Sequence, residues 1–295
     1  MFDVCAVGHV TQDVIRVDGA VKKRMPGGAV YYASLALRRL GRTVAVVTKL
    51  APEDAALLSE MRLEKIDVSC SNSAATTVFE NLYDRAEPDR RIQRVTAVAE
   101  PFTPSDLGNL RARFFHLGPL TNRDLGPKML KEASARGKVA LDAQGLVRKI
   151  QGGQIRGVKP EGWAEWKAAL ARVCILKVNE SEARILSGQS DPGLAAQQLA
   201  LLGPREVIVT LGSKGSLIFH DRRCHLIDPV PPRHLVDPTG SGDTYMAGYL
   251  HRRLDSEDVE RAARFASAVA TLAVECSGPF QASTEEVEAR LKGRG

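Results

Sequence analysis

Short apolar runs alternate with stretches of helical spacing along most of this sequence. The apolar runs lie at about 3–8, 43–49, 114–118, 139–143, 173–178, 206–211 and 216–220. Helices are expected between them at about 29–40, 53–64, 124–135 and 192–202, with a long helix from Ser256. Strands that alternate with helices predict a parallel sheet, because each crossover helix returns the chain to the edge where the next strand begins. The sequence therefore predicts an α/β fold of three layers, a doubly wound and mostly parallel sheet.

A second pattern interrupts this alternation in the first hundred residues. Two strand-like runs, 76–83 and 91–98, flank a polar and turn-rich segment, and this arrangement predicts a hairpin. A further strand is expected just after Asp13, which lies past the end of the first strand. No repeat or linker divides the chain. We expect a single domain that spans residues 1–295. Residues at about 12–26 and 74–99 are expected to form a small β-sheet lid on it.

Composition limits the partners of the chain. The net charge of +6 raises the question of nucleic acid, but the basic residues are scattered in pairs and only 5% of residues are aromatic, so no nucleic-acid partner is expected. No apolar run approaches the roughly 20 residues that span a bilayer, and neither a membrane partner nor a signal peptide is expected. Five dispersed cysteines without a C-x-x-C pair indicate no zinc site and fit a reducing, cytoplasmic location.

The most informative local motif is V-D-P-T-G-S-G-D at residues 236–243, just before a helical stretch. Gly240 and Gly242 flank Ser241, so the turn can direct several backbone N–H groups at one point, beside the free donors of the helix. Such amides form an anion site. Asp243 would repel a bound phosphate, but it can accept a proton from a hydroxyl that attacks a phosphorus held beyond the amides. The alternative is an ordinary capped helix after a turn.

This motif resembles the D-T-x-G-A-G-D signature of the ribokinase-like, or phosphofructokinase-B (PfkB), small-molecule kinases. It departs from the signature at Pro238 and Ser241, and neither change removes a glycine or a carboxylate. The resemblance implies a kinase that uses ATP and Mg²⁺, with Asp243 as the catalytic base and the glycine-loop amides around the transferred phosphoryl group. It also implies a response to K⁺, with Asp237 as a neighbour of the monovalent cation.

Two motifs near the N-terminus resemble the acceptor-binding parts of the same family. Asp13 follows Gly8 in a G-x-x-x-x-D spacing, which in the family binds substrate hydroxyls. By itself Asp13 is more typical of a solvated loop carboxylate. Gly27 and Gly28 precede a predicted helix, where a glycine pair either forms a plain turn or lets substrate approach the backbone. The ribose kinases of the family carry asparagine in the next helical turn, whereas this chain has two tyrosines there, which argues against ribose.

The segment D-A-Q-G-L-V-R resembles part of the plant and archaeal inositol-kinase-like members, and this implies Gln144 and Arg148 as substrate ligands. Together with the G-G-A-V-Y-Y helix start, it favours myo-inositol or a related cyclitol as the acceptor. A nucleoside or another sugar is the alternative within the family, because Tyr31, Tyr32 or Phe79 could stack on a base.

Asn179 and Glu182 follow a predicted strand with N-x-x-E spacing. Asn179 suits the N-cap of a helix and Glu182 its third position, so an ordinary capping box explains the pair. In the resembled family, N-x-x-E organises magnesium and phosphate, often through water, which implies Glu182 as a metal neighbour. The resemblance adds four ATP-binding positions: Thr210, Gly212, Lys214 and Ser267. The first three are also consistent with a plain hairpin turn.

The absence of a Walker A sequence excludes a P-loop kinase, and no strand-linked G-x-G-x-x-G supports a dinucleotide oxidoreductase. The hypothesis is ATP-dependent phosphorylation of a hydroxyl on a small polyol or sugar, by a monomer or a homodimer. A protein of another class, a non-catalytic regulator that binds a sugar or nucleotide, is the competing hypothesis. Four arginines of the predicted lid either hold phosphate or are solvated: Arg85, Arg90, Arg91 and Arg94.

Overall fold

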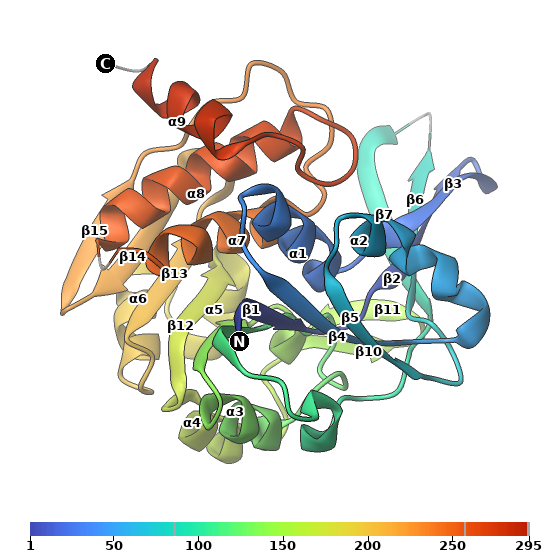
Figure 1. Cartoon of the computed structure of the whole chain (residues 1–295), viewed down its shortest axis with the longest axis horizontal. Helices are drawn as coiled ribbons and strands as arrows, with labels where there is room; N and C mark the ends of the chain where they lie inside the picture. Colours follow the sequence, from blue (N-terminus) through green and yellow to red (C-terminus); the bar gives the residue numbers. More distant parts are fainter. Residues whose placement is uncertain (85–86, 257, 294–295) are drawn as a thin grey trace.

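The computed structural model describes residues 1–84, 87–256 and 258–293 and places the larger of two sheets at the centre of the molecule (Figure 1). From β13 to β5, all neighbouring strands of this sheet are parallel, and β14 and β15 extend one edge in antiparallel pairing. In spatial order the strands are β15 (Arg223–Ile227), β14 (Ser216–His220), β13 (Glu206–Thr210), β12 (Val173–Asn179), β9 (Lys138–Asp142), β8 (Ala112–Leu117), β1 (Phe2–Val7), β4 (Val44–Leu50) and β5 (Asp67–Asn72).

Helices cover both faces of the central sheet, so the predicted three-layer, doubly wound α/β fold is confirmed. One core contains residues of α1 (Ala29–Arg39), η1 (Pro52–Leu58), α2 (Ser59–Leu63), α7 (Ser241–Arg253), α8 (Val259–Val274) and α9 (Thr284–Lys292). The other contains residues of η2 (Pro104–Leu107), α3 (Pro127–Ser134), η3 (Gly145–Val147), α4 (Trp163–Leu170), α5 (Glu180–Ser187) and α6 (Pro192–Ala200). A short turn, η4 (Gly212–Lys214), joins β13 to β14.

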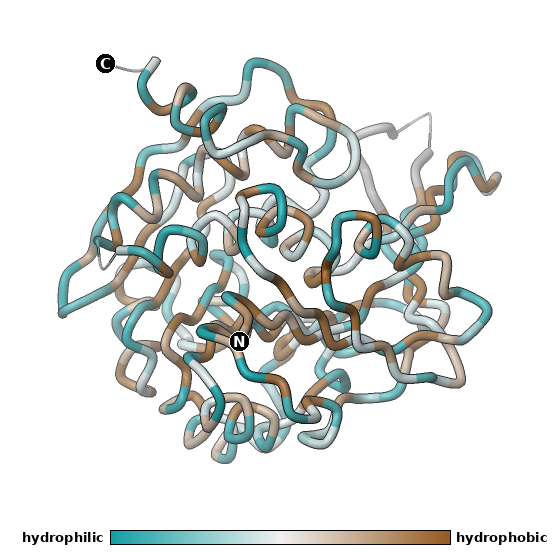
Figure 2. The backbone as a smooth tube through the Cα atoms, in the orientation of Figure 1, coloured by the Kyte–Doolittle hydropathy of each residue, from teal (hydrophilic) through white to brown (hydrophobic). Residues whose placement is uncertain are grey.

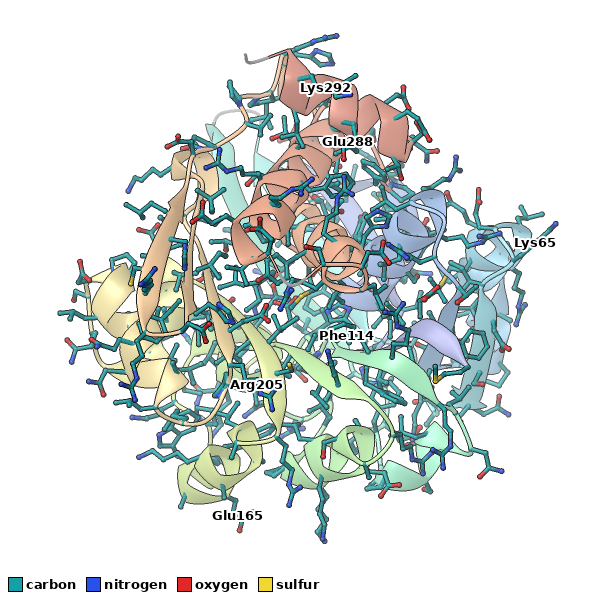
Figure 3. All side chains as sticks on the ribbon, turned by 60° about the vertical axis from the view of Figure 1, so that its left-hand side comes forward. Lys65, Phe114, Glu165, Arg205, Glu288 and Lys292 are labelled. Carbon is teal, nitrogen blue, oxygen red and sulfur yellow. The ribbon has the colours of Figure 1, made fainter. Side chains whose placement is uncertain are left out.

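Side-chain alternation along the buried strands fills the two cores. Val4 and Ala6 of β1 pack in the first core, and Cys5 and Val7 pack in the second, because successive residues of a strand point to opposite faces. Figure 2 shows the most hydrophobic stretches concentrated in the centre of the molecule, and in Figure 3 charged side chains such as Lys65 point outward around the rim. Among the described residues, no helix is long and apolar enough to cross a membrane.

The smaller sheet lies beside the carboxyl ends of the parallel strands. Its order is β10 (Arg148–Gln151), β11 (Gln154–Gly157), β7 (Glu87–Ala97), β6 (Val78–Asp84), β2 (Thr11–Val17) and β3 (Ala20–Gly27). Four of these strands fall within the ranges expected for a lid, whereas β10 and β11 were not expected. Asp13 does come after the end of β1 at Val7, but the strand expected to begin after Asp13 begins at Thr11, so Asp13 lies inside β2.

Three expected helix boundaries also differ. The helix expected at 53–64 is divided into the 3₁₀ turn η1 and the short α2. The helix expected from 124 begins at Pro127, because Asp124 instead accepts hydrogen bonds from the backbone N–H groups of Leu120 and Thr121. The last long helix begins at Val259, with Asp258 rather than Ser256 as its N-cap.

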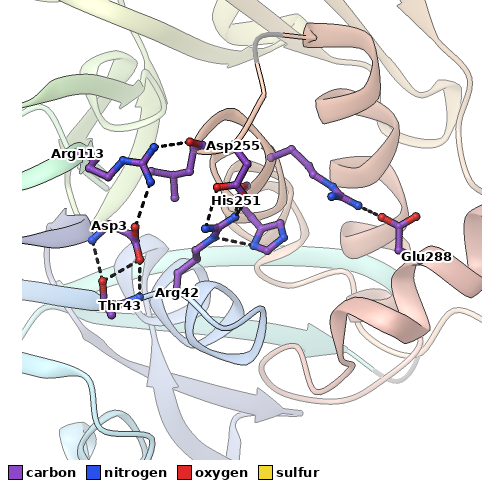
Figure 4. Close-up of polar contacts among 9 residues, drawn as sticks. Asp3, Arg42, Thr43, Arg113, His251, Asp255 and Glu288 are labelled. Atoms are coloured by element: carbon purple, nitrogen blue, oxygen red, sulfur yellow. Dashed lines mark hydrogen bonds and ion pairs between the residues drawn. The ribbon is translucent and has the colours of Figure 1, made fainter.

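A polar network ties the carboxyl end of α7 to the loop between α1 and β4 (Figure 4). Arg42 Nε donates to His251 Nδ1 at 3.0 Å, and the same guanidinium forms an ion pair with Asp255. Burial, followed by the nearby Arg42 charge, lowers the pKa of His251 to about 4, so the imidazole is neutral near pH 7 and can accept this hydrogen bond. On the sheet side, Asp3 accepts hydrogen bonds from the backbone N–H and the hydroxyl of Thr43. The network fixes the end of α7 that is remote from its N-terminal turn.

Candidate active site

The loop that leads into α7 turns at Gly240, which is the N-cap of that helix. Its φ is 73°, in the left-handed region that residues with a Cβ rarely adopt. A Cβ placed on Gly240 would lie 2.4–2.7 Å from ring carbons of Tyr32, closer than van der Waals contact allows. Glycine is therefore required at this position both for the backbone conformation and for the close approach of Tyr32.

The first turn of α7 leaves backbone donors without acceptors. Thr244 N donates to Gly240 O at 2.8 Å, and Ser241 N donates within the loop at 3.2 Å. In the described part of the chain, no acceptor receives the amides of Gly242 or Asp243, as is usual for the first turn of a helix. These two N–H groups, at the positive end of the helix dipole, form a site suited to an anion.

A cavity of about 300 Å³ lies against this turn, at the carboxyl ends of β12 and β13 and beneath the small sheet. It brings together residues that are far apart in the sequence. The predicted site residues that line it are Asp13, Gly28, Gln144, Arg148, Asn179, Glu182, Thr210, Gly240, Ser241, Gly242 and Asp243. Further lining residues include Tyr32, Lys177, Phe79 and Gln93.

One wall of the cavity is built around Asp13. Thr11 Oγ1 donates to Asp13 Oδ1 at 2.8 Å, which orients the carboxylate. Gly27 does not line the cavity, but it lies directly behind Asp13, since a Cβ on Gly27 would be 2.6 Å from that carboxylate. Gly28 has a φ of 97°, and a Cβ there would be 2.3 Å from the carbonyl oxygen of His9. The glycine pair therefore lets the chain entering α1 pack tightly against Asp13 of β2 and against His9, which precedes that strand.

Tyr32 carries an unsatisfied polar atom at the cavity. Its hydroxyl is buried and has no hydrogen-bond partner among the described residues. Burial, and then the nearby Asp13 carboxylate, raise the pKa of Tyr32, so the phenol is protonated at neutral pH. Tyr31 packs edge-to-face on Tyr32 with ring centroids 5.3 Å apart, and its own hydroxyl donates to Glu60. Of these adjacent tyrosines, one is fully paired and the other has a hydrogen bond left to make.

Asp243 is half-buried at the junction of α7 with the cavity. Burial raises the pKa of its carboxyl to about 7. The negative charge of Asp142 raises this pKa further, and the positive charges of Lys177 and Arg148 lower it. A carboxyl group that titrates near neutral pH is well matched to accepting a proton from a reacting hydroxyl at physiological pH.

Lys177 is the principal site residue that the motifs did not reveal. It lies on β12, and its ammonium group forms an ion pair with Asp142. Its Nζ would be 3.6 Å from a Cβ placed on Gly242, directly below the glycine loop. Burial lowers the pKa of Lys177, but the carboxylates of Asp142, Asp243 and Glu182 together raise it, so its pKa lies above the ordinary value and the group is charged. The only sequence signal was a lysine within the otherwise apolar run V-C-I-L-K-V.

Asn179 and Glu182 form the capping box of α5. Asn179 Oδ1 accepts from Glu182 N at 2.9 Å, and Glu182 Oε2 accepts from Asn179 N at 2.9 Å. Both residues also line the cavity, and burial raises the pKa of Glu182. No cluster of three or more potential metal ligands occurs among the described residues. Mg²⁺ bound mainly by phosphate oxygens and water needs only one or two carboxylates, so a single carboxylate that lines the cavity, Glu182, fits that ion.

A second cavity, of about 480 Å³, lies on the other side of the glycine loop. Thr210, Gly212 and Ser267 line it, together with Pro229, Val230, Tyr245 and Val274. Lys214 lines neither cavity: its side chain is 75% exposed and lies 4.0 Å from Glu180. The two cavities share four lining residues, Thr210, Pro238, Ser241 and Gly242, and so meet at the loop.

The remaining predicted residues do not line these cavities, or they lie outside the part of the chain that the structure describes. Asp237 lines neither cavity, and its Oδ1 accepts from Thr239 N at 2.9 Å, which stabilises the loop. Arg94 lines neither cavity. Arg85 and the side chains of Arg90 and Arg91 fall outside the described residues.

Comparisons with known proteins agree with this geometry. A cytidine kinase of Thermococcus kodakarensis is 26% identical over 263 residues, which cover 85% of this chain and 88% of the relative. An inositol 3-kinase of Arabidopsis thaliana is 26% identical and the match covers 98% of this chain and 80% of the relative. A solved pyrophosphate-dependent kinase in the ribokinase family, complexed with a pyrophosphate analog and myo-inositol, has a TM-score of 0.85 at 26% identity, covering 97% of this chain and 99% of its own.

The family assignment follows from a match over almost the whole length. Residues 1–286 match the family described as pfkB family carbohydrate kinase. The resemblance carried by D-P-T-G-S-G-D is thereby confirmed. The fold, the glycine loop and the match together show that this chain belongs to the pfkB family of carbohydrate kinases.

Proposed function

We propose that this protein transfers the γ-phosphoryl group of ATP to a hydroxyl of a small polyol, with myo-inositol or a related cyclitol as acceptor. The observation that carries the proposal is the meeting of two cavities at the glycine loop, where Asp243 and two free amides lie together. A polar cavity on one side suits an acceptor rich in hydroxyl groups, and the cavity on the other side suits the donor.

Each group then has one role in the transfer. Asp13, Gln144 and Arg148 hold the acceptor by its hydroxyl groups. Asp243 accepts the proton of the reacting hydroxyl while the oxygen of that hydroxyl bonds to the γ-phosphorus. At the same time the bond from the γ-phosphorus to the bridging oxygen of ADP breaks. The amides of Gly242 and Asp243 face the negative charge of the transferred group, and Lys177 adds a positive charge below them.

Cations assist at two proposed positions. Mg²⁺ bound to the triphosphate would neutralise phosphate charge during transfer. Glu182, which is hydrogen-bonded to Asn179 and lines the cavity, is the carboxylate that we propose to lie next to the Mg²⁺ ion. Asp237, in the loop before Gly240, is the proposed neighbour of K⁺. The ATP-side residues are Thr210, Gly212 and Ser267, and Lys214 is left for the solvent-exposed edge of that site.

The second cavity favours a nucleotide as the phosphoryl donor. Pyrophosphate would need only the amides of the glycine loop and the Lys177 ammonium group below them. The cavity beyond that loop is about 480 Å³ and has Val230, Leu235, Ala270 and Val274 among its lining residues. Such an apolar recess is suited to a flat base. We therefore propose ATP rather than pyrophosphate, although one structural relative is described as pyrophosphate-dependent.

A nucleoside acceptor is the second candidate. One relative is named a cytidine kinase, and Phe79 and Tyr32 line the acceptor cavity, where either ring could stack on a base. Against it, the lining of that cavity is dominated by polar and charged groups, which match a ring of hydroxyls better than a planar base. The relevant comparison is therefore between a cyclitol and a nucleoside under identical conditions.

A donor-by-acceptor panel tests the proposal. We expect ADP release with ATP, Mg²⁺ and myo-inositol, and much slower phosphate transfer when pyrophosphate replaces ATP. Cytidine, adenosine, ribose and a set of inositol epimers complete the acceptors, with phosphorylated product identified by mass spectrometry. Turnover only with nucleosides would replace the cyclitol by the second candidate. Saturable binding of myo-inositol without any turnover would instead point to a non-catalytic regulator.

Tyr32→Phe is expected to lower kcat/KM for the acceptor by about tenfold, because the substituted ring keeps its contact with Gly240 but loses the free hydroxyl. The matched control is Tyr31→Phe, which removes the hydroxyl already paired with Glu60. That variant should melt at a lower temperature and keep the acceptor KM of the wild type. Steady-state kinetics and thermal melts on both variants provide the measurement. Equal acceptor kinetics in Tyr32→Phe and the wild type would show that this hydroxyl does not contact the acceptor.

A further inference from the structure

Three neighbouring strands of the central sheet place polar side chains in one row. His116 on β8, Asp142 on β9 and Lys177 on β12 lie near the carboxyl ends of these strands, which are adjacent in the sheet. All three point to the same face, because residues two positions apart on a strand share a face. The residues two positions earlier are apolar and belong to one core: Phe114, Ala140 and Ile175.

The row is buried and incompletely paired. His116, Asp142 and Lys177 are 0%, 2% and 6% exposed. One oxygen of Asp142 binds Lys177, while the other, Oδ2, lies 3.6 Å from His116 Nε2. Among the described residues, neither that oxygen nor either ring nitrogen of His116 has a hydrogen-bond partner. Buried polar groups are nearly always paired, and apolar residues are often at least as stabilising as a buried ion pair, so folding alone does not account for the row.

Only one member of the row reaches the active site. Lys177 lines the acceptor cavity and lies below Gly242, whereas His116 and Asp142 do not line it. A lysine side chain is long and flexible, so an ammonium group is held in one place only if its partners hold it there. Any effect of His116 or Asp142 on the reaction must therefore pass through Lys177 or through the electrostatic field at the loop.

We propose that His116 and Asp142 are positioning residues that hold Lys177 beneath the glycine loop, where it meets the phosphoryl group being transferred. This inference rests on the proposed kinase function and adds two residues to it. Asp142 fixes the ammonium group with one oxygen, and His116 restrains the other oxygen, so that the carboxylate cannot turn away from Lys177. Without His116, Asp142 keeps its charge but loses the group that faces Oδ2.

The charges of Asp142 and Lys177 in this row also change the pKa of Asp243. The charged groups that act on Asp243 come from four elements: Asp142 on β9, Lys177 on β12, Arg148 on β10 and Glu182 on α5. Asp142 raises the pKa of Asp243, so its neutralisation in Asp142→Asn should lower that pKa. In a plot of kcat against pH, the fall in kcat on the acid side should then occur at lower pH. A simple packing defect would not cause this shift.

Two substitutions of His116 and one of Asp142 test the proposal. His116→Leu should lower kcat by about tenfold, because a small displacement of Lys177 misplaces it for the transfer, and acceptor KM should stay near the wild-type value. His116→Gln keeps a side-chain N–H donor and should recover most of the activity. Asp142→Asn should lower kcat and shift the acid-side fall in kcat to lower pH. The control is Phe114→Leu, which lies two residues earlier on the same strand and face and should change only the melting temperature.

Nucleotide binding gives a readout that needs no turnover. If Lys177 meets the transferred phosphoryl group, His116→Leu should weaken ATP binding in calorimetry and leave ADP binding unchanged, because ADP lacks that group. A wild-type ATP-to-ADP affinity ratio in a folded His116→Leu protein, together with a wild-type pH profile of kcat in Asp142→Asn, would overturn the positioning role. A wild type without kinase activity on any acceptor would instead overturn the proposed function, and the affinity ratio would still test the row.

Discussion

Asp243→Asn is expected to lower kcat by at least about 100-fold while leaving ATP affinity nearly unchanged. Asparagine has almost the same size and preserves the first turn of α7, but its amide cannot accept the proton of the reacting hydroxyl. The two backbone amides that face the phosphoryl group remain, so donor binding should survive. Steady-state ADP release and calorimetric titration with ATP measure the two quantities separately.

The same residue predicts a pH dependence. In the wild type, kcat should fall as pH drops through about 7, because burial raises the pKa of Asp243 to about 7 and the protonated acid cannot act as a base. The folded chain binds this proton more tightly than the unfolded chain, in which an aspartate has a pKa of about 3.9. Stability from this group is therefore greatest at low pH and is lost as pH rises from about 4 to about 7.

Asp243→Asn removes that loss, so the variant should melt above the wild type at pH 8, and the difference should shrink near pH 4. Asp258→Asn is the matched control: Asp258 caps the start of α8, and asparagine caps helices equally well. That control should show wild-type kcat and melting temperature. A fully active Asp243→Asn protein would remove this carboxylate from the mechanism.

Gly240→Ala is expected to lower kcat by about 100-fold, because the loop amides must keep their positions to act on the phosphoryl group. Alanine in the left-handed region costs roughly 1–2 kcal/mol in backbone strain. Its Cβ would also lie 2.4 Å from the nearest ring carbon of Tyr32, so either the loop or the ring has to move. Movement of the loop displaces both free amides, and movement of the ring opens the acceptor cavity.

Gly41→Ala separates these two effects. Gly41 also has a positive φ, 84°, but a Cβ there meets nothing within 4 Å. This variant should lose a similar amount of stability to backbone strain and keep wild-type kcat. Equal activity of Gly240→Ala and Gly41→Ala, compared at a temperature where both are folded, would show that contact with Tyr32 is unimportant for the loop.

Much of the fold could be predicted from the sequence because its signals are local. Buried parallel strands such as β1 and β12 are continuous apolar runs, and helices separate most of the parallel strands that follow one another in the chain. The strands β10 and β11 gave no such signal. They are four residues each, largely polar, and joined across two glycines. Their place in the small sheet depends on pairing of Gln154 with Arg94, sixty residues away in the sequence, which no local pattern specifies.

The site was predictable where one motif carries several groups, as in the glycine loop. It was not predictable where the groups come from separate strands. Lys177, Asp142 and His116 each lie in an apolar run, and only the pairing of three strands and the contacts between their side chains show that they form a row. Lys214 shows the limit of sequence spacing: it is close in sequence to Thr210 and Gly212, which line the second cavity, but its side chain is exposed to solvent. Asn179 and Glu182 serve as a helix cap and line the cavity, so the two interpretations of N-x-x-E are compatible.

The thin partition between the two cavities has a practical consequence for inhibitor chemistry. Of the residues that the structure describes, four line both cavities, and all of them lie in or beside the glycine loop. A bisubstrate compound, with an adenosine moiety tethered through a short phosphate chain to a cyclitol, could occupy both compartments at once. Joining the two halves makes the second binding event intramolecular, so such a compound should bind far more tightly than either half alone if the tether matches the span.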